Sequence, residues 1–419
     1  MRDNRLRANS LLLAILIGAW PLAAAPQLKY VVIVSRHGVR SPTWNGERLH
    51  QYSAEPWPDF GVPPGDLTPH GRDLIKILGS YYREWFAADH LLAPSGCADA
   101  QRVYIWADTD QRTLETGRAF ADSLVPGCGL SIHSRPQGER DPLFSGSGNP
   151  DTRAAADAVR QRLGPDPQAL LKEHRGELDT LQFILTGGKD APQKLLGPSE
   201  SIAAVIQGNN VELQGPFSTA STMTENLLLE YADGMQGAQF GWGRVTKDDL
   251  IRVLALHRVY ADLMRRTPYL ARARGSNLMT RILASMEQAV SGKASPGALG
   301  SPGTALLVLS GHDTNQANVA GMLGLSWSLP GYQPDETPPG GALIFSLWRN
   351  SEDGQYFVRT EFLAASLDQM HDASALTPAA PPLRQRVSLP ACGASDCPWS
   401  GFKKVLQTSI DGNIDFGAR

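Results

Sequence analysis

The 419-residue sequence predicts an α/β protein with a central, mostly parallel sheet flanked by helices and a smaller α-helical domain inserted. Continuous runs of apolar and β-branched residues indicate the sheet: YVVIVS at 30–35, RVYIWAD at 102–108 and TALLVLS at 304–310. Such runs are typical of strands that are buried on both faces. Helical patterns without a convincing buried strand fill residues 150–265, and they predict the inserted domain.

The segment LTPHGRDLIKILGSYYREWF at 67–86 predicts a helix between the first two strands. Thr68 can cap its first turn, and Pro69 suits the first helical position. Its apolar side chains recur at helical spacing at Leu74, Leu78, Tyr81 and Trp85. Two late segments, GGALIFSLWRN and YFVRTEFLA, predict strands that are joined by the polar turn SEDGQ and extend the sheet.

The N-terminus has the layout of a secretory signal peptide over residues 1–25. Three arginines precede the apolar block LLLAILIGAW, which is too short to span a bilayer, and small residues follow it. We therefore expect an exported protein, periplasmic or secreted, that does not stay in the membrane after cleavage. The expected domains are 26–149 with 266–419 for the α/β catalytic part and 150–265 for the helical cap.

Composition indicates a packed globular protein, because 42% of the residues are hydrophobic. Residues 1–25 hold three Arg and one Asp, so the exported chain would keep 36 basic and 41 acidic residues, a net charge near −5. This balance argues against nucleic acid as a partner. An anionic ligand must then be held by local charge rather than by the field of the whole molecule.

Four cysteines are expected to pair in an oxidising compartment. The simplest scheme joins Cys97 to Cys128 and Cys392 to Cys397, although four cysteines allow three pairings and the sequence does not choose among them. Zinc is the alternative, but neither Cys-x-x-Cys nor His-x-x-x-His spacing supports it. We expect neither a metal nor a cofactor.

Charged side chains follow three of the predicted strands where each strand ends. The first strand leads into Arg36, His37 and Arg40, and the third into His312 and Asp313. RVYIWAD leads into TDQRTLETGRAF, which places Arg112 at the start of the next helix. In open α/β sheets, ligands bind beyond the carboxyl ends of the strands. These residues are therefore expected to form one site.

The expected cluster has the chemistry of a phosphoryl-transfer site. Three guanidinium groups would repel one another unless a multiply charged anion lay between them, and arginine binds phosphate oxygens through paired hydrogen bonds. Neutral His37 could attack phosphorus and form a covalent intermediate. Asp313 could protonate the departing alcohol if its carboxyl is protonated. Four other histidines have no such neighbours in the sequence and are assigned to helix faces or the surface: His70, His90, His174 and His257.

The motifs RHGVRSP and GHDTN resemble those of the histidine acid phosphatases, the branch of the histidine phosphatase superfamily that includes bacterial periplasmic phytases. ADTDQRTLETGRAF, DPLF, GPFSTASTMTENLLLEYADGM and PDETPPGGALIFSLW keep the family's order, so the resemblance covers nearly the whole exported chain. It implies that His37 is the nucleophile and Asp313 the proton donor. It also implies that phosphate is bound by Arg36, Arg40, Arg112 and His312.

The resemblance suggests two further substrate-binding residues, each with a structural alternative. Thr43 falls where the bacterial phytases contact phosphate, but a threonine after proline is also common in turns. Glu225 lies where those enzymes place a substrate-side glutamate. It also completes Thr222-x-x-Glu225, the spacing of a helix capping box, and of the two roles we favour the cap.

The predicted activity is a phosphomonoesterase of phytase type that acts on inositol phosphates and other phosphomonoesters through a phosphohistidine. Gly38 resembles the acid phosphatase and phytase group, whereas the related glucose-1-phosphatases tend to carry Asn there. Trp44 departs from the basic residue that bacterial phytases often have at this place. A broad acid phosphatase or a glucose-1-phosphatase is therefore the alternative.

Two other classes are less well supported by the sequence. A phosphoglycerate-mutase-like transferase shares the RHG loop, but that branch is typically cytosolic and does not use such a His-Asp pair. A catalytically silent phosphate-binding protein would need the arginines without His37 or Asp313, and both residues are present. The expected partner is a small phosphomonoester, and the chain is expected to be a monomer.

Overall fold

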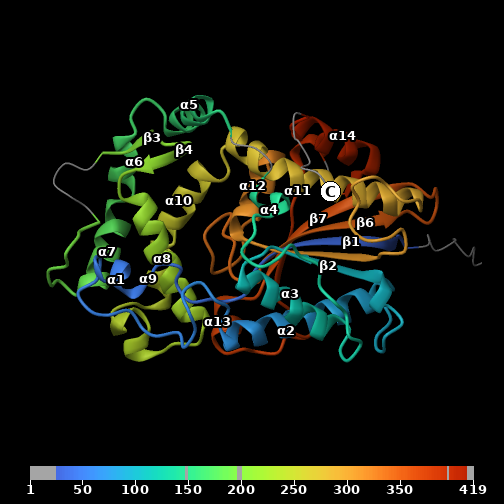
Figure 1. The fold of residues 1–419 in the computed structure, drawn as a ribbon, viewed down its shortest axis with the longest axis horizontal. Helices are drawn as coiled ribbons and strands as arrows, with labels where there is room; N and C mark the ends of the chain where they lie inside the picture. The colour runs from blue at the N-terminus through green and yellow to red at the C-terminus, as the bar shows by residue number, and fades with distance from the viewer. Residues whose placement is uncertain (1–24, 147–149, 196–200, 394–395, 413–419) are drawn as a thin grey trace, which may run out of the picture.

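The computed structural model describes residues 25–146, 150–195, 201–393 and 396–412. The chain forms two lobes (Figure 1), a larger one built on a sheet and a smaller one built mainly from helices. The predicted signal peptide falls on residues 1–25, of which 1–24 lie outside the described residues. Among the described residues, no helix has both the length and the apolarity that crossing a membrane requires.

The larger lobe is organised around a sheet that has seven strands in the described part of the chain, in the order β2-β5-β1-β6-β7-β8, with β9 also paired to β7. The strands are β1 (Gln27–Arg36), β2 (Val103–Ala107), β5 (Leu306–Gly311), β6 (Ala342–Arg349), β7 (Tyr356–Ala364), β8 (Leu383–Arg386) and β9 (Asp396–Pro398). The three predicted core strands are the neighbours β2, β5 and β1, and they run parallel.

The other side of the sheet is antiparallel. β6 pairs with β1 and β7, and β7 also pairs with β8 and β9. Four of the seven described strands, β1, β2, β5 and β7, point the same way, so the sheet is mostly parallel in strand direction although its β6–β9 side is paired antiparallel. The predicted pair of late strands is confirmed as the hairpin β6–β7. The predicted α/β class is confirmed as well.

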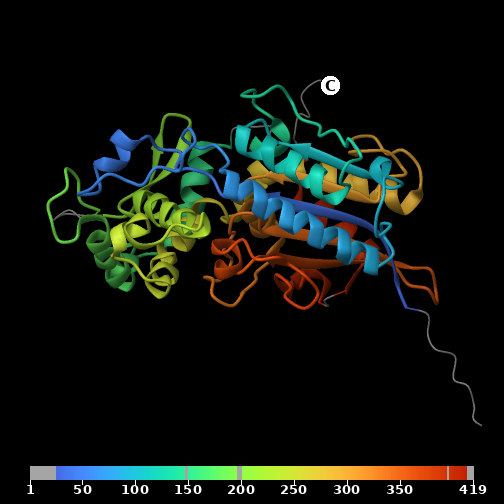
Figure 2. The same cartoon turned by 90° about the horizontal axis from the view of Figure 1, so that it is seen from below.

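Helices cover both faces of the sheet (Figures 1 and 2). Helices α2 and α3 lie on one face, and α11, α12 and α14 lie on the other. The helices of the larger lobe are α2 (Pro69–Ala88), α3 (Gln111–Leu124), α4 (Pro142–Ser145), α11 (Pro268–Ser291), α12 (Asp313–Leu323), α13 (Leu367–His371) and α14 (Trp399–Ser409). The alternation along β1 explains why its whole run is apolar: Val31 and Ile33 pack in the core with α2, while Val32 and Val34 pack in the opposite core.

The start of α2 agrees with the sequence prediction. The Thr68 side chain accepts a hydrogen bond from the Gly71 N–H, and Pro69 is the first helical residue. Both features satisfy the needs of a helix N-terminus, where backbone N–H groups have no partner within the helix.

The smaller lobe is formed mainly by the region predicted as the helical cap. Its helices are α5 (Thr152–Leu163), α6 (Gln168–Glu173), α7 (Arg175–Thr186), α8 (Phe217–Ala232), α9 (Lys247–Val253) and α10 (Ala255–Met264). The region also contains an antiparallel hairpin, β3 (Ala203–Gln207) and β4 (Asn210–Gln214), which the sequence analysis missed. Its strands are short and only half-buried, so they lack the continuous apolar run by which we recognised the core strands.

Residues assigned by sequence to the catalytic part also belong to the smaller lobe in space. Helix α1 (Gly46–His50) lies beside α7 and α9 in Figure 1. The next residues bond to that lobe, because the Ala54 N–H donates to Leu185 O at 3.1 Å and the Gln193 N–H donates to Gln51 O at 2.7 Å. The predicted domain boundaries at 150 and 265 therefore describe segments of the chain, and they stay a prediction.

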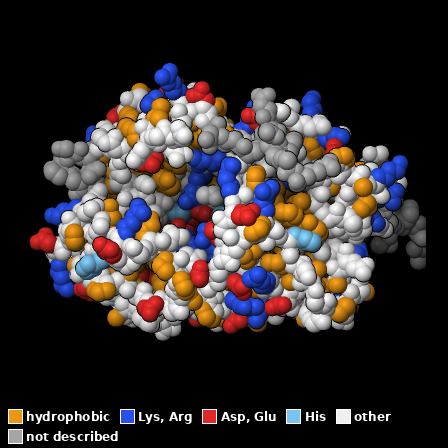
Figure 3. Space-filling model, in the orientation of Figure 1, with side chains coloured by type: hydrophobic (Ala, Val, Ile, Leu, Met, Phe, Trp, Pro, Cys, Tyr) orange, Lys and Arg blue, Asp and Glu red, His pale blue; other side chains and the backbone are white. Residues whose placement is uncertain are grey.

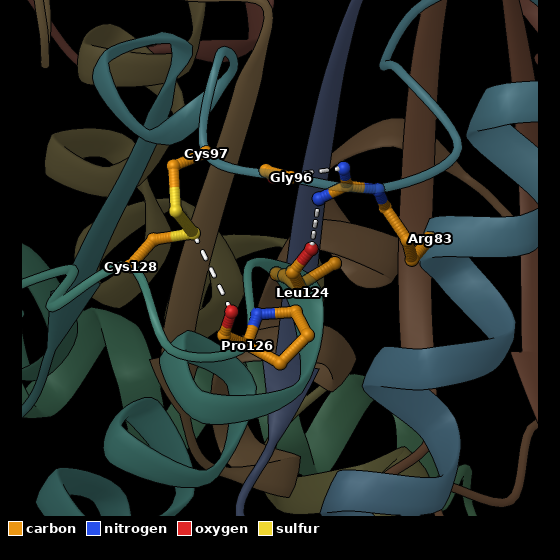
Figure 4. The surroundings of a disulfide bond; sticks show 6 residues. All are labelled: Arg83, Gly96, Cys97, Leu124, Pro126 and Cys128. Atoms are coloured by element: carbon orange, nitrogen blue, oxygen red, sulfur yellow. Dashed lines mark hydrogen bonds between the residues drawn. A yellow bond between two sulfur atoms is a disulfide. The ribbon is translucent and has the colours of Figure 1, made fainter.

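Two disulfides, Cys97–Cys128 and Cys392–Cys397, follow the simplest pairing considered from the sequence. Figure 4 shows the first of them, which links the segment after α2 to the segment after α3. Beside it, the buried Arg83 of α2 donates to Gly96 O and Leu124 O. The bond and this arginine together hold the ends of the two helices that cover one face of the sheet.

Candidate active site

The predicted site residues come together where β1, β2 and β5 end. In the β1–β5 register, Ser35 faces Ser310 and Arg36 faces Gly311, so His37 and His312 both follow at the same edge. The His37 and His312 rings lie 5.6 Å apart, centroid to centroid, in an edge-to-face arrangement. Figure 3 shows a hollow between the two lobes in which basic, acidic and histidine side chains gather.

The His37 ring is held in one tautomer by its own loop. Its Nδ1 lies 2.8 Å from Gly38 O, and because a carbonyl oxygen can only accept, Nδ1 carries the hydrogen. Nε2 then has a free lone pair when the ring is neutral. The His37 main chain is fixed at both ends, since its N–H donates to Gly311 O and its carbonyl accepts from the Gly340 N–H.

Two effects keep His37 neutral. Burial is the larger, and the cations Arg112, Arg36 and Arg40 add to it, so the pKa of His37 lies well below its usual value. Both causes favour the form of the ring that can act as a nucleophile.

Gly38 has a packing role next to this histidine. A Cβ at this position would lie 2.8 Å from Gly71 O and 2.9 Å from a side-chain carbon of Ile75. The Gly38 N–H also donates to Thr116 Oγ1 at 3.0 Å. Any side chain here would therefore push against α2 and displace the loop that carries His37.

Arg36 and Arg40 share one carboxylate. The Arg36 side chain is completely buried, and its Nη2 and the Arg40 Nη2 both donate to Glu225 Oε1, the latter at 3.0 Å. Arg36 Nη1 donates to Thr337 O at 2.5 Å. Burial raises the pKa of Glu225, but the charges of Arg40 and Arg36 lower it by more. The pKa of Glu225 therefore lies below its usual value. Glu225 is thus an ionised counter-charge inside the site.

The capping role favoured for Glu225 is wrong. Helix α8 begins at Phe217, so Thr222 and Glu225 both lie inside it, and the Thr222 hydroxyl donates to Ser218 O. A capping box needs its first residue at the helix start. Thr222 and Glu225 have the sequence spacing of a capping box, but the Glu225 side chain pairs with Arg36 and Arg40 instead.

Arg112 and Thr43 lie near each other at the outer side of the cluster. Arg112 Nη2 donates to Asp110 Oδ2, and its Nη1 donates weakly to Gly65 O at 3.4 Å. A Cβ on Gly65 would be 3.5 Å from Arg112 Nη1 and 3.6 Å from the Thr43 methyl group. Thr43 is exposed. Its neighbourhood is compatible with a phosphate contact, which stays a prediction.

His312 is oriented by a residue that the sequence analysis did not single out. Its Nε2 lies 2.8 Å from Asp108 Oδ2 and 3.6 Å from Asp110 Oδ2. Asp108 follows β2 directly, at the strand end where Arg112 was identified. The argument that site residues follow strand ends could therefore have identified Asp108, but we applied it only to Arg112.

Asp313 is the first residue of α12, and its carboxylate accepts from Arg265 Nη1. Burial raises the pKa of Asp313, but Arg265 and Arg36 hold it well below the usual range. Arg265 follows α10 and was missed, because nothing in its local sequence places it beside a residue 48 positions away. Asp313 is therefore ionised while it is paired with Arg265.

His257 also differs from its predicted setting. It lies on α10, it is buried, and its Nδ1 is 3.2 Å from the Ser221 hydroxyl of α8. The assignment to a helix face was correct, but this face points into the protein, behind Glu225.

A neutral histidine among three arginines at the carboxyl edge of an α/β sheet is suited to a phosphomonoester hydrolase that works through a phosphohistidine. The comparisons agree with this class. The sequence matches the model of the Histidine phosphatase superfamily (branch 2) over residues 27–170 and 213–362, and the chain belongs to that family.

Similar proteins fall within the phytase and acid phosphatase group. Phytase AppA of Escherichia coli (strain K12) is 35% identical, with 94% of this chain and 96% of that protein covered. Glucose-1-phosphatase of Providencia rettgeri is 27% identical, with 92% of each covered. Hafnia alvei phytase, solved in complex with myo-inositol hexakis sulphate, superimposes with a TM-score of 0.84 at 36% identity, covering 93% of this chain and 98% of that one. The chain is thus a phytase-type histidine acid phosphatase.

Replacing Glu225 by Gln should destabilise the free protein, because Arg36 would keep its buried charge without a counter-charge. We expect a loss of about 2–4 kcal/mol in the free energy of unfolding at pH 7. The folded-state pKa of Glu225 is lowered, so the wild type has this stabilisation above the unfolded pKa and loses it as the pH falls through the folded value. Urea unfolding at pH 7 and pH 3 measures the difference, which should shrink at pH 3.

Inorganic phosphate should restore much of the stability of Glu225→Gln, since the anion can replace the missing charge. The matched control is Glu55→Gln, which removes an exposed carboxylate that also pairs with two cations, Lys189 and Arg244. The control should change little and should not respond to phosphate. Equal losses in the two variants would contradict the role given to Glu225.

Proposed function

We propose that this protein is an exported phosphomonoesterase that hydrolyses inositol phosphates and other phosphomonoesters through a phosphohistidine on His37. The observation that carries the proposal is the His37 ring, which is buried, holds its proton on Nδ1 and lies in the field of Arg36, Arg40 and Arg112. A neutral imidazole with a free Nε2 surrounded by fixed cations is suited to attack a phosphorus atom whose oxygens those cations hold.

In the first step, the Nε2 lone pair of His37 forms a bond to phosphorus while the ester P–O bond breaks. Arg36, Arg40, Arg112 and His312 bind the non-bridging oxygens, and Asp313 gives its proton to the leaving alcohol oxygen. In the second step, water attacks phosphorus and the N–P electron pair returns to His37. The Asp313 carboxylate accepts the proton of that water, and inorganic phosphate is released.

Asp313 must gain a proton before it can act as the acid. Without phosphate its pKa is low, because Arg265 and Arg36 favour the carboxylate. A bound phosphate group would offset these positive charges and raise its pKa, and acidic solution supplies the proton. We therefore expect an acidic pH optimum, with activity falling as Asp313 ionises on the alkaline side.

Inositol phosphates are the proposed substrates because of the likeness to the phytases, one of which was solved with an inositol hexakis sulphate. The alternative, a broad acid phosphatase or glucose-1-phosphatase, is favoured by Trp44, which carries no charge where a cation would help to bind many phosphates. Trp44 is half-buried, and the Arg48 guanidinium lies 3.6 Å from the centre of its ring. The Arg48 guanidinium therefore supplies a positive charge beside this position, although Trp44 itself carries none.

Export to the periplasm or outside the cell is proposed from the N-terminal pattern, and the two disulfides support it. The substrate is a small phosphomonoester, and none of the proposed steps uses a metal or a cofactor. We propose that the enzyme acts as a monomer, because every residue given a role comes from one chain.

His37→Ala should abolish turnover and leave a folded protein that still binds phosphate, because the arginines and Glu225 stay in place. A substrate labelled in its phosphoryl group, followed by an alkaline quench, should leave label on His37 of the wild type, since phosphohistidine is labile in acid. Label on a serine or an aspartate would contradict the mechanism.

Asp313→Asn should slow poor leaving groups most, because a nitrophenolate departs without needing a proton whereas an alkoxide needs one. We expect a loss of roughly 10²–10⁴-fold for an alkyl phosphate and a much smaller loss for nitrophenyl phosphate. The measurement is kcat/KM for both substrates. Equal losses would mean that Asp313 only positions its neighbours.

Trp44→Lys should raise kcat/KM for phytate relative to an aryl phosphate, because it adds a cation beside Arg48. Trp44→Phe is the matched control, since it keeps an aromatic face and should leave the ratio unchanged. The ratio is best measured across pH 4–7. An unchanged ratio in Trp44→Lys would show that this position does not face the substrate.

A further inference from the structure

A buried acid and a buried base face each other behind the phosphate-binding residues. Glu336 and His257 have side chains that are 1% and 3% exposed, and Glu336 Oε1 lies 3.9 Å from His257 Nε2. Within the described part of the chain, neither carboxylate oxygen of Glu336 makes a hydrogen bond of normal geometry, nor does His257 Nε2. Buried groups of this kind are costly and call for an explanation. The mechanism proposed above uses neither residue.

The loop that carries Glu336 is also the wall behind the nucleophile. Thr337 O accepts from Arg36 Nη1, the Gly340 N–H donates to His37 O, and Gly341 O accepts from the Arg36 N–H. Three residues of this loop thus form hydrogen bonds with Arg36 or His37. A change in the charge or position of Glu336 acts on residues that touch the phosphate-binding group.

The backbone before Glu336 has a left-handed conformation. Asp335 has φ +61°, which most residues other than glycine seldom adopt but which aspartate and asparagine tolerate. It is held there by Trp327, whose carbonyl oxygen accepts from the Asp335 N–H and whose N–H donates to Asp335 Oδ1, and by Arg266, whose Nη2 lies 3.3 Å from Asp335 Oδ2. The Trp327 indole N–H also donates to Glu336 O at 2.8 Å. The structure thus fixes Glu336 from both sides.

His257 connects the pair to the other wall of the site. Its Nδ1 lies 3.2 Å from the hydroxyl of Ser221 on α8. Ser221 is one helical turn before Glu225, so both residues lie on the same side of α8. Glu225 holds Arg36 and Arg40. The two buried residues therefore contact both elements that hold Arg36.

The surroundings of Glu336 mix charges of both signs. Burial raises its pKa, whereas His257 and Arg36 lower it, and the net direction is up. Among the described residues, the charged or titratable groups around Glu336 come from several elements: Arg36 on β1, Glu225 on α8, His257, Arg258 and Asp262 on α10, Arg266 after α10, and Asp335 and Tyr332 on its own segment. A small cavity of about 10 Å³ also borders Glu336 and His257.

We propose that Glu336, which faces His257, is a positioning residue of the phosphate-binding wall, and that the protonation of Glu336 controls how tightly the arginines bind phosphate. While Glu336 is protonated, its side chain carries no charge. When the pH rises and Glu336 ionises, a negative charge appears directly behind Arg36, and it opposes the charge of the phosphate. The inference rests on the proposed phosphatase site.

The test is isothermal calorimetry of inorganic phosphate binding to the wild type and to Glu336→Gln at pH 5 and pH 7. Gln keeps the shape of the side chain but cannot ionise. We expect the dissociation constant of Glu336→Gln to be about fivefold lower than that of the wild type at pH 7 and within about twofold of it at pH 5. Repeating the pH 7 titration in two buffers with different ionisation heats should show less proton uptake in the variant.

Three variants complete the experiment. Glu336→Asp keeps the carboxylate and should keep the pH dependence of the wild type. Glu336→Met also cannot ionise and has no amide, so it replaces Glu336→Gln if the amide disturbs folding, with the same expected result. Glu177→Gln is the matched control, because Glu177 forms a similar acid–histidine pair, 3.8 Å from His174 Nδ1, in the smaller lobe. It should leave phosphate binding unchanged at both pH values.

Two results would overturn the inference. In the first, Glu336→Gln changes the phosphate affinity by the same factor at pH 5 and pH 7 and takes up as many protons as the wild type, which would mean that Glu336 only supports the loop. In the second, Glu336→Gln binds phosphate with the affinity of the wild type at both pH values. If instead the wild type neither bound phosphate nor hydrolysed phosphomonoesters, the proposed function would fail together with the inference, so the two failures are distinguishable.

Discussion

The structure depends on one buried cation. The Arg36 side chain has no exposed surface, although it lies at the end of the central strand β1. Burying an unpaired guanidinium would cost several kcal/mol, so partners must reach it from elsewhere in the chain. Glu225 comes from the smaller lobe and Thr337 from the loop before β6. The placement of both lobes around the sheet edge therefore follows from the need to neutralise and bond this one side chain.

The same requirement shapes the chemistry. Glu225 pairs with both Arg36 and Arg40, which leaves one positive charge uncompensated, and Arg265 pairs with Asp313. A phosphate dianion entering this site meets cations that already have partners, so binding exchanges internal ion pairs for external ones. Such an exchange lets the protein stay folded with four arginines close together, and it makes the protonation of the carboxylates part of substrate binding.

Much of the fold and of the site could be predicted because their signals are local. Buried strands show as continuous apolar runs, and His37, His312 and Asp313 follow such strands directly. Arg265 and Glu336 could not be found this way, since their roles come from contacts with residues far away in the sequence. The β3–β4 hairpin was missed because half-buried strands lack a strong pattern. The chain segments predicted as domains also could not reveal that α1 packs on the other lobe.

Glu225 shows why a correct motif can give a wrong role. The spacing Thr222-x-x-Glu225 satisfies a capping box, but a cap is worth only about 1 kcal/mol, and the buried arginines need a counter-charge that is worth more. When a local and a tertiary use of one side chain compete, the larger free energy decides. A tertiary contact also decides the residue at Gly38, next to the nucleophile. A Cβ there would lie only 2.8 Å from Gly71 O on α2. The residue next to the nucleophile is therefore constrained by how α2 packs, whatever contact it makes with a substrate.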